Sequence, residues 1–206
     1  MANTVLDNFK SDLTSQPLDW VADNYIFEGT PFVFKDQPES TRVLIDHLSA
    51  ELGLMANNLR IIGSAKIGFS LDPNNFPRDF TDRSDIDVLV VDEQLFDTIW
   101  MIVLKWHYPR RIAGLFGDDH QWMRKRRKDL YWGWLHPDKI RYEGLSLPEV
   151  LRPLRDISTK WFNAFHSLSL YSELSGRNVS GRLYRSWDHA RSYHCDTLQQ
   201  IKDNIA

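Results

Sequence analysis

The stretch that decides the fold runs from Ile61 to Val91 and reads IIGSAKIGFSLDPNNFPRDFTDRSDIDVLVV. It opens at the end of a short β-rich run that begins at Leu59, and it closes on Asp85–Val91, whose apolar end predicts a buried strand. Between the two strands, Gly63-Ser64 begins a short helical segment, and a loop rich in Pro, Asn and Asp follows. We therefore expect the candidate functional residues of the chain in the Gly-Ser turn and at the start of the second strand.

Two carboxylates stand at the start of the second strand. Asp85 and Asp87 flank Ile86, and residues i and i+2 of a strand point to one face. Neighbouring carboxylates repel each other unless a cation lies between them. Hard oxygen ligands of this kind suit Mg²⁺, which typically takes one or two protein carboxylates together with phosphate oxygens and water. The alternative is an exposed strand end whose acids are solvated or cap a turn.

The Gly63-Ser64 turn has the chemistry of a phosphate site. Glycine lets backbone N–H groups approach an anion closely, a helix N-terminus carries positive partial charge, and the Ser64 hydroxyl adds a hydrogen bond. The alternative is a plain N-cap turn without a ligand. Lys66, just inside the helical segment, is either a further phosphate contact or an ordinary surface lysine.

This arrangement resembles the nucleotidyltransferase superfamily typified by DNA polymerase β, whose minimal motif is a Gly-Ser pair followed by Asp-x-Asp on the next strand. The resemblance covers Leu59–Asp92, about one-sixth of the chain, and the matching residues are Gly63, Ser64, Gly68, Ser84, Asp85, Ile86 and Asp87. It implies an α+β fold: a small mixed β-sheet of the nucleotidyltransferase type flanked by helices, with additional N-terminal and C-terminal helices.

The resemblance also implies an activity. Asp85 and Asp87 would be catalytic and hold Mg²⁺ or Mn²⁺, and Gly63 and Ser64 would hold the β- and γ-phosphates of a nucleoside triphosphate, with ATP expected. A nucleoside monophosphate would pass to a hydroxyl on RNA, a protein or a small molecule. Small members of the superfamily are often toxin–antitoxin or phage-defence components, so the resemblance implies such a context too.

The sequence departs from the superfamily pattern in the loop Leu71–Arg83, which separates the two motifs by more than in small members. Some larger members, including enzymes that make cyclic oligonucleotide signals, tolerate a comparable insertion. We expect this loop to lie over the nucleotide.

A second departure concerns the third carboxylate that active members take from a later strand. The late strand expected at Asn178–Trp187 contains no acid, but Asp188 follows it. If that strand runs antiparallel to Asp85–Val91, Asp188 reaches the metal site and is the third catalytic acid. Otherwise Asp188 caps the following helix. Glu173 and Asp129 are weaker candidates.

One run of cations stands out in a mildly acidic chain. Arg124, Lys125, Arg126, Arg127 and Lys128 are consecutive, and Trp122, Tyr131, Trp132 and Trp134 lie around them. A solvated helix face is the plain interpretation. The functional one is a phosphate-tracking surface for an RNA acceptor, in which Arg124, Arg126, Arg127 and Lys128 take part. On the late strand, either Arg182 or Arg185 is expected to face the cleft.

Composition excludes several classes of protein. The chain has 206 residues, of which 42% are hydrophobic, and this composition excludes disorder throughout. Its net charge of −3 argues against binding of nucleic acid over the whole surface. The single cysteine, Cys195, excludes an intramolecular disulfide framework and a multi-cysteine zinc site. No apolar run is long enough to span a bilayer, and the N-terminus shows no secretion signal, so we expect a cytoplasmic protein without a membrane partner.

The hydrophobic period predicts the remaining elements. We expect one domain over 1–206, in which an N-terminal helical extension of about 1–55 precedes the motif core at about 59–92. A helical segment at about 93–171 and a closing strand and helix at about 178–205 follow. Helices are expected at Thr4–Leu13, Glu39–Leu52, Glu93–Trp106, Asp118–Trp132, Leu147–Leu170 and Asp188–Ile205, and Tyr25–Phe34 is expected to be an extended connector or a short strand pair.

Three functions remain open at this point. The first is a Mg²⁺-dependent nucleotidyltransferase, which the intact pair Asp85 and Asp87 favours. The second is a catalytically inactive protein of the same fold that binds nucleotide, RNA or a partner protein, which the missing third acid favours. The third is an RNA-binding protein that uses the basic, aromatic helix alone.

Overall fold

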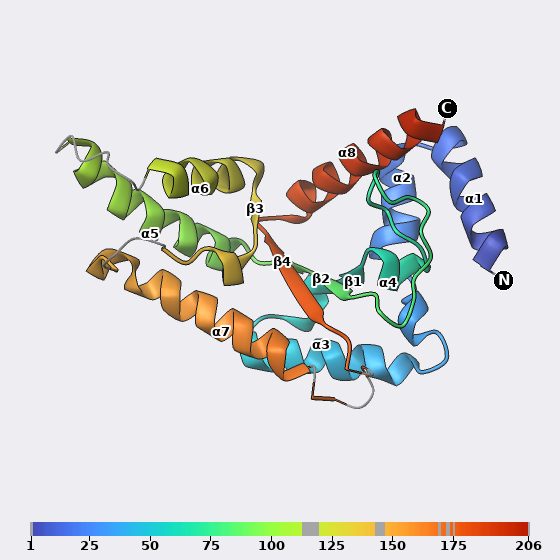
Figure 1. The fold of residues 1–206 in the computed structure, drawn as a ribbon, viewed down its shortest axis with the longest axis horizontal. Coiled ribbons are helices and arrows are strands. Elements are labelled where there is room, and N and C mark those ends of the chain that lie inside the picture. The colour runs from blue at the N-terminus through green and yellow to red at the C-terminus, as the bar shows by residue number, and fades with distance from the viewer. Residues whose placement is uncertain are drawn as a thin grey trace.

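The computed structural model describes residues 2–112, 120–142, 147–168, 170–171, 174 and 176–205, and they form an α+β fold (Figure 1). The strands are β1 (Leu59–Ile62), β2 (Ile86–Val91), β3 (Trp134–Leu135) and β4 (Val179–Tyr184). The helices are α1 (Ala2–Ser15), α2 (Leu18–Ala22), α3 (Pro38–Leu52), α4 (Ser64–Ile67), α5 (Glu93–Ile112), α6 (His120–Trp132), α7 (Arg152–Leu168) and α8 (Trp187–Ile205).

The four strands form one mixed sheet in the order β1-β2-β4-β3. β1 is antiparallel to β2, β2 is parallel to β4, and β3 is antiparallel to β4. The registers place Asp87 between Ile62 on β1 and Ser180 on β4. The prediction of an α+β fold with a small mixed sheet flanked by helices is therefore confirmed.

Both faces of the sheet are covered by helices, which explains the unbroken apolar end of β2. On one face, Val88 and Val90 pack into a core with side chains of α3, α5 and α7. On the other, Leu89 and Val91 join a second core formed largely by α1, α2 and α8. Because side chains alternate along a strand, Asp85 and Asp87 belong to the second face.

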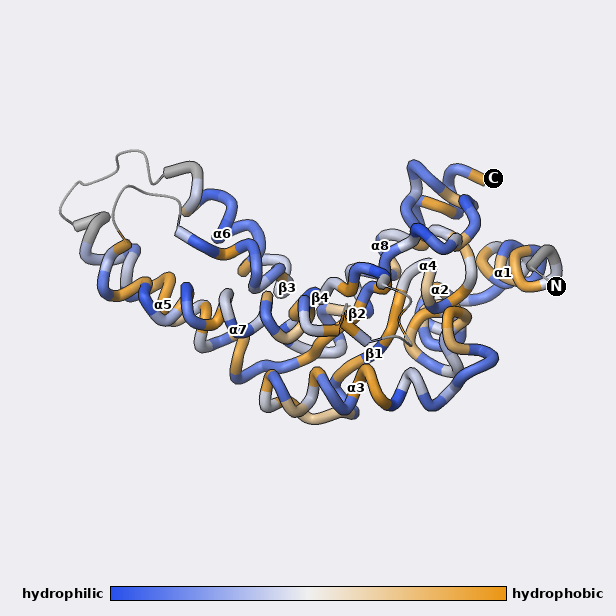
Figure 2. Tube along the Cα trace, turned by 60° about the horizontal axis from the view of Figure 1, so that its bottom comes forward, coloured by the Kyte–Doolittle hydropathy of each residue, from blue (hydrophilic) through white to orange (hydrophobic). Residues whose placement is uncertain are grey.

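The helices on the two faces lie on different sides of the molecule. In Figure 1, α3 and α7 run together beneath the sheet, α1, α2 and α8 lie at one side, and α5 and α6 extend from the other. Figure 2 shows that α6 is hydrophilic over much of its length, in keeping with its run of cations. No helix in the described part of the chain is both long and apolar enough to cross a bilayer.

One sequence prediction for local structure is wrong, and another has the start of a helix misplaced. The segment Tyr25–Phe34 is neither extended nor a strand pair, because a π-helical turn (Asp23–Phe27) and a 3-10 turn (Phe32–Phe34) bring its apolar side chains into the cores. The helix expected at Leu147–Leu170 begins later, as a 3-10 turn (Glu149–Leu151) followed by α7. Pro153 lies in the first turn of α7, where its missing N–H has no partner to lose.

Gly181 determines how closely α7 packs on the sheet. A Cβ atom added at Gly181 would overlap the ring of Phe165 on α7, which is itself buried. The ring therefore lies directly against the β4 backbone. Any side chain at this position must displace a tightly packed aromatic residue.

We predict that Gly181→Ala lowers the free energy of unfolding by about 1–3 kcal/mol, the usual cost of overpacking a core. Urea denaturation followed by far-UV circular dichroism measures the change. Ser192→Ala, an exposed position on α8, is the control and should change stability by less than about 0.5 kcal/mol. Equal stabilities of Gly181→Ala and the control would contradict the packing described here.

Candidate functional site

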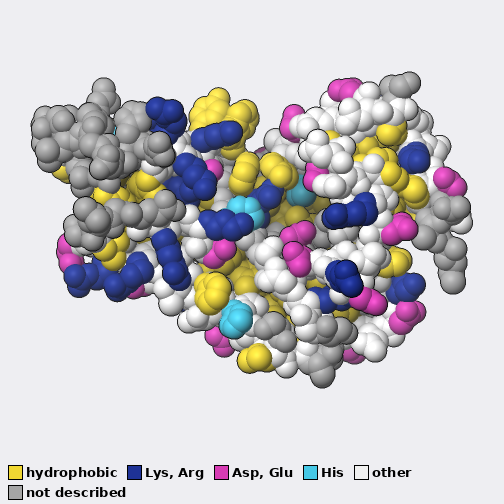
Figure 3. All heavy atoms as spheres, in the orientation of Figure 1, with side chains coloured by type: hydrophobic (Ala, Val, Ile, Leu, Met, Phe, Trp, Pro, Cys, Tyr) yellow, Lys and Arg dark blue, Asp and Glu magenta, His cyan; other side chains and the backbone are white. Residues whose placement is uncertain are grey.

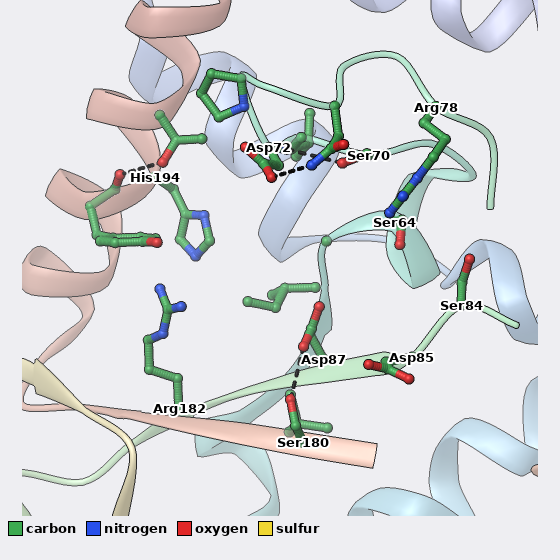
Figure 4. A pocket seen from close by; sticks show the side chains of 18 of the residues that line it. Ser64, Ser70, Asp72, Arg78, Ser84, Asp85, Asp87, Ser180, Arg182 and His194 are labelled. Atoms are coloured by element: carbon green, nitrogen blue, oxygen red, sulfur yellow. Dashed lines mark hydrogen bonds between the residues drawn. The ribbon is translucent and has the colours of Figure 1, made fainter. Parts of the chain in front are cut away.

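A cavity of about 680 Å³ opens on the second face of the sheet, beside the N-terminal ends of β2 and β4 (Figure 4). Gly63 and Ser64 line it, as do Asp85 and Asp87. The loop between the two motifs forms another wall, and β4 and α8 complete it. The structure thus brings the Gly-Ser pair and the Asp-x-Asp pair into one cavity.

Asp87 lies in the middle of this arrangement. The Ser180 hydroxyl donates a hydrogen bond to Asp87 Oδ1 at 2.9 Å. On the other side, a Cβ atom at Gly63 would lie 3.3 Å from Asp87 Oδ2. Gly63 has φ +67°, a left-handed conformation that favours glycine, and it is the N-cap of α4. The Gly-Ser backbone and the carboxylate are therefore close neighbours.

The electrostatics of the pair suit a cation. Asp87 is open to the cavity, but protein surrounds it on the remaining sides, and this desolvation raises its pKa; the nearby Asp85 raises it further. The Ser180 hydrogen bond and the charge of Arg182 act in the opposite direction. A divalent ion between the two aspartates would relieve both the desolvation and the repulsion.

The donor set fits one Mg²⁺ ion better than a cage of protein ligands. Within the described residues, no group of three or more His, Cys, Asp and Glu side chains is arranged to hold a metal. Asp85 and Asp87 supply two hard oxygen ligands on one face, and Mg²⁺ ordinarily fills its other positions with water and phosphate oxygens. Asp85 and Asp87 are thus the side chains that would hold such an ion.

The loop between the motifs is an ordered wall of the cavity. Asp72 accepts hydrogen bonds from the Asn74 backbone and the Asn75 amide, and these bonds lower its pKa. Arg177 holds the end of the loop by donating to the carbonyl oxygens of Thr81 at 2.6 Å and Ser84 at 3.1 Å. Arg78 points from this loop toward Ser64 (Figure 4). That the loop covers a nucleotide stays a prediction.

The assignment of Asp188 to the metal site is wrong. It required β4 to run antiparallel to β2, but the two strands are parallel. The β4 residue beside Asp87 is Ser180, near the start of the strand, whereas Asp188 follows the other end of the strand, beyond Tyr184, which is already about 13 Å from Ser180 at a rise of about 3.3 Å per residue. Asp188 is instead in the first turn of α8, where a carboxylate faces the positive end of the helix.

The assignment of Lys66 to the nucleotide site is also wrong. Its side chain is only 6% exposed, and Nζ donates to the carbonyl oxygen of Gly29 at 2.5 Å, away from the cavity. Burial lowers the pKa of Lys66, and the charge of Arg60 adds to that effect. Lys66 therefore ties α4 to the N-terminal segment.

The basic run on α6 is divided by the structure. Arg126 is buried, donates to the Lys139 carbonyl oxygen at 3.1 Å and pairs with Asp129 at 3.4 Å, so it does not belong to a surface. Arg124, Arg127 and Lys128 are exposed, which both a solvated face and a binding face require. Asp129 is thus a structural partner rather than a third metal ligand, and Glu173 lies outside the described residues.

The end of the cavity nearest α8 contains Arg182, one of the two arginines expected to face the cleft, and two histidines that the sequence did not indicate. Arg182 lies between the rings of Trp134 and Tyr193, at 4.7 and 4.5 Å from their centroids. Its Nε donates to His136 Nε2 at 3.3 Å. Burial lowers the pKa of His136 to about 4, and Arg182 contributes. Of the two late-strand arginines, Arg182 therefore faces the cavity, while Arg185 turns to the opposite face and pairs with Asp97.

His194 on α8 completes this end of the cavity. It points toward Arg182 (Figure 4), and its side chain is 7% exposed. Burial lowers its pKa to about 3, with a further contribution from Arg182. Its Nε2 atom is buried and has no hydrogen-bond partner among the described residues. No signal in the sequence identified His194 as part of this site.

Comparison of the chain with protein-family models, with curated proteins and with solved structures finds no match in any of the three.

We predict that His194 makes the fold sensitive to acid. Between its lowered pKa in the fold and the ordinary value near 6.5, the unfolded chain binds a proton that the folded chain does not. The free energy of unfolding therefore falls as pH drops from 7 to 5, by about 2 kcal/mol at most from this residue. His194→Gln removes this contribution, so its stability should fall less over the same pH range. Urea denaturation at both pH values measures the difference, and parallel pH profiles would contradict the assignment.

Proposed function

We propose that the chain is a nucleotidyltransferase that binds a nucleoside triphosphate with Mg²⁺ in this cavity and transfers the nucleoside monophosphate to a hydroxyl acceptor. The observation behind the proposal is the close approach of the two motifs: a Cβ atom added at Gly63 would lie 3.3 Å from Asp87 Oδ2, and Ser64 and Asp85 line the same cavity. A polyphosphate held at the turn would therefore reach an ion held by the aspartates.

The residues of the chain would divide the work as follows. Asp85 and Asp87 would hold the divalent ion, which when bound supplies positive charge to the reacting phosphate and the leaving pyrophosphate. Ser64, the backbone at Gly63 and the Arg78 guanidinium would bind the terminal phosphates. The loop that carries Arg78 would keep bulk water from the phosphates. The chain's contribution is thus positioning and charge neutralisation.

A second candidate function is nucleotide binding without transfer, and Ser180 favours it. β4, the later strand beside Asp87, presents Ser180 there and contains no acid, whereas active members of the superfamily take a third carboxylate from a later strand. A hydroxyl cannot take the place of a carboxylate as a charged metal ligand. The chain would then bind the Mg²⁺–nucleotide complex as a sensor or as part of a complex with a partner.

We predict that the double variant Asp85→Asn/Asp87→Asn loses transfer by at least about 10³-fold, because the ion loses both protein ligands. The purified chain is incubated with each α-³²P-labelled nucleoside triphosphate, Mg²⁺ and cellular RNA or lysate, and labelled products are separated by electrophoresis. In parallel, calorimetry measures binding of Mg²⁺–ATP.

The matched control is Asp188→Asn. This variant removes an exposed acid from the first turn of α8, outside the cavity. It should leave binding and transfer at the wild-type level. Binding of Mg²⁺–ATP without any transfer would select the second candidate function. Unchanged binding in Asp85→Asn/Asp87→Asn would overturn both.

A further inference from the structure

The order of the strands separates the two ends of the cavity. Gly63 follows β1 and Asp87 lies on β2, so the proposed triphosphate site occupies the β1–β2 side. Ser180 and Arg182 lie on β4, and His136 follows β3 at the far edge of the sheet. A second substrate that meets the nucleotide at Asp87 therefore has the β4–β3 side available to it.

The inner part of that side has unused hydrogen-bonding capacity. Arg182 is two residues beyond Ser180 on the same face of β4, about 7 Å along the strand. It makes no ion pair with an acidic side chain among the described residues. His194 Nε2, also buried here, lacks a partner within the same part of the chain. A guanidinium whose hydrogen bonds go to His136 and to tyrosine hydroxyls rather than to a carboxylate, beside an unsatisfied ring nitrogen, suits a phosphate or hydroxyl group of a ligand.

The helix α6, which leads into β3 at this edge of the sheet, carries a surface that we call the α6 surface: Arg124, Lys125, Arg127, Lys128, Tyr131 and Trp132. All six residues are exposed, with Tyr131 at 78% and Trp132 at 55%. The two rings pack edge to face, 5.1 Å between centroids, and remain open to solvent. In Figure 3, Lys and Arg side chains gather over the α6 side of the molecule, next to the hollow.

The charge of this region contrasts with that of the whole chain. Residues 124–141 contain seven Lys and Arg and two Asp, whereas the chain as a whole has a net charge of −3. α6 leads directly into β3, and Trp134 on β3 stacks on Arg182. Cationic side chains and exposed rings therefore continue from the α6 surface to the wall of the cavity.

We propose that the α6 surface binds single-stranded nucleic acid and that Arg182 and His194 receive its end, so that the acceptor of the transfer is a terminal hydroxyl of that strand. This inference rests on the proposed function for the reaction itself. The acceptor oxygen forms a bond to the α-phosphorus, the bond from that phosphorus to the pyrophosphate oxygen breaks, pyrophosphate leaves with the electron pair, and the hydroxyl proton passes to solvent water.

The chemistry of the surface favours a single strand over other partners. Cations track phosphates, and exposed aromatic rings stack on unpaired bases, which a duplex does not offer. An acidic protein would use the cations but would leave the two exposed rings without a stacking partner. The combination of both features on one helix therefore points to single-stranded nucleic acid.

The test is fluorescence anisotropy with a labelled oligouridine of about 15 nucleotides, long enough for one binding site of this type. Removal of the rings in Tyr131→Ala/Trp132→Ala should weaken binding about fivefold or more, as loss of a stacked base does. Lys125→Glu/Lys128→Glu should weaken it at least tenfold and flatten the dependence of log affinity on log salt by about 0.7 per cation lost.

The matched control carries the same charge change elsewhere. Lys35→Glu/Lys160→Glu alters two exposed lysines near α3 and should retain wild-type affinity within about twofold. Thermal melting of every variant establishes that it is folded. Asp85→Asn/Asp87→Asn should bind the oligonucleotide as the wild type does, because these residues belong to the nucleotide end.

These measurements separate the two proposals. Loss of Mg²⁺–ATP binding with intact oligonucleotide binding in Asp85→Asn/Asp87→Asn supports both. Absence of Mg²⁺–ATP binding in the wild type overturns the proposed function, whatever the oligonucleotide does. Equal affinity of the α6 variants and the lysine control, equal binding of a duplex, or no binding of the oligonucleotide at all overturns the α6 surface.

Discussion

The parallel pairing of β2 with β4 is the constraint on which the site depends. It is held by the ladder from Ile86–Val179 to Val91–Tyr184 and by cores on both faces of the sheet. Because the two strands start at the same edge, Ser180 and Arg182 are brought beside Asp87, and Asp188 is carried to the far end. Gly181 lets α7 cover the other face of β4 without displacing this register. The composition of the cavity follows from the direction of one strand.

The cavity that results has two chemically different ends. Near β1, a glycine turn and two aspartates lie together, an arrangement that is unfavourable without a cation and suited to a polyphosphate. Near β3, a half-buried arginine lies between aromatic rings, with His136 and His194 beside it. The first end suits a metal–nucleotide complex, and the second suits a ligand with anionic or hydroxyl groups. A transferase needs both, whereas a protein that only stores or senses a nucleotide needs the first.

Much of this frame could be predicted from the sequence, and the failures have physical reasons. β1, β2, α3 and α8 follow from local periodicity and caps, and Gly63, Ser64, Asp85 and Asp87 follow from residue types whose placement is local. The direction of β4 is not local: α5, α6, β3 and α7 intervene, and the pattern of apolar residues along a strand is the same whichever way it runs. The prediction that Lys66 contacts phosphate was wrong because its amine is bound by the Gly29 carbonyl oxygen, 37 residues away in the chain. The sequence near Lys66 carries no sign of that distant partner. His136 and His194 could not be predicted as site residues, because they approach Arg182 only through the packing of β3, β4 and α8 in the fold.

The most direct test of the central claim, that the aspartate pair and the glycine turn jointly hold a metal–polyphosphate complex, is a Mn²⁺ titration of the wild-type chain followed by electron paramagnetic resonance. It is run alone, with adenosine, and with an ATP analogue that cannot be cleaved between its α- and β-phosphates. We expect the protein to bind Mn²⁺ weakly alone or with adenosine, and to bind it with the analogue at least about tenfold more tightly than either the protein alone or the analogue without protein, because carboxylate and phosphate oxygens together complete the coordination of the ion. Binding with the analogue that is no tighter than these references would exclude a joint site for metal and polyphosphate.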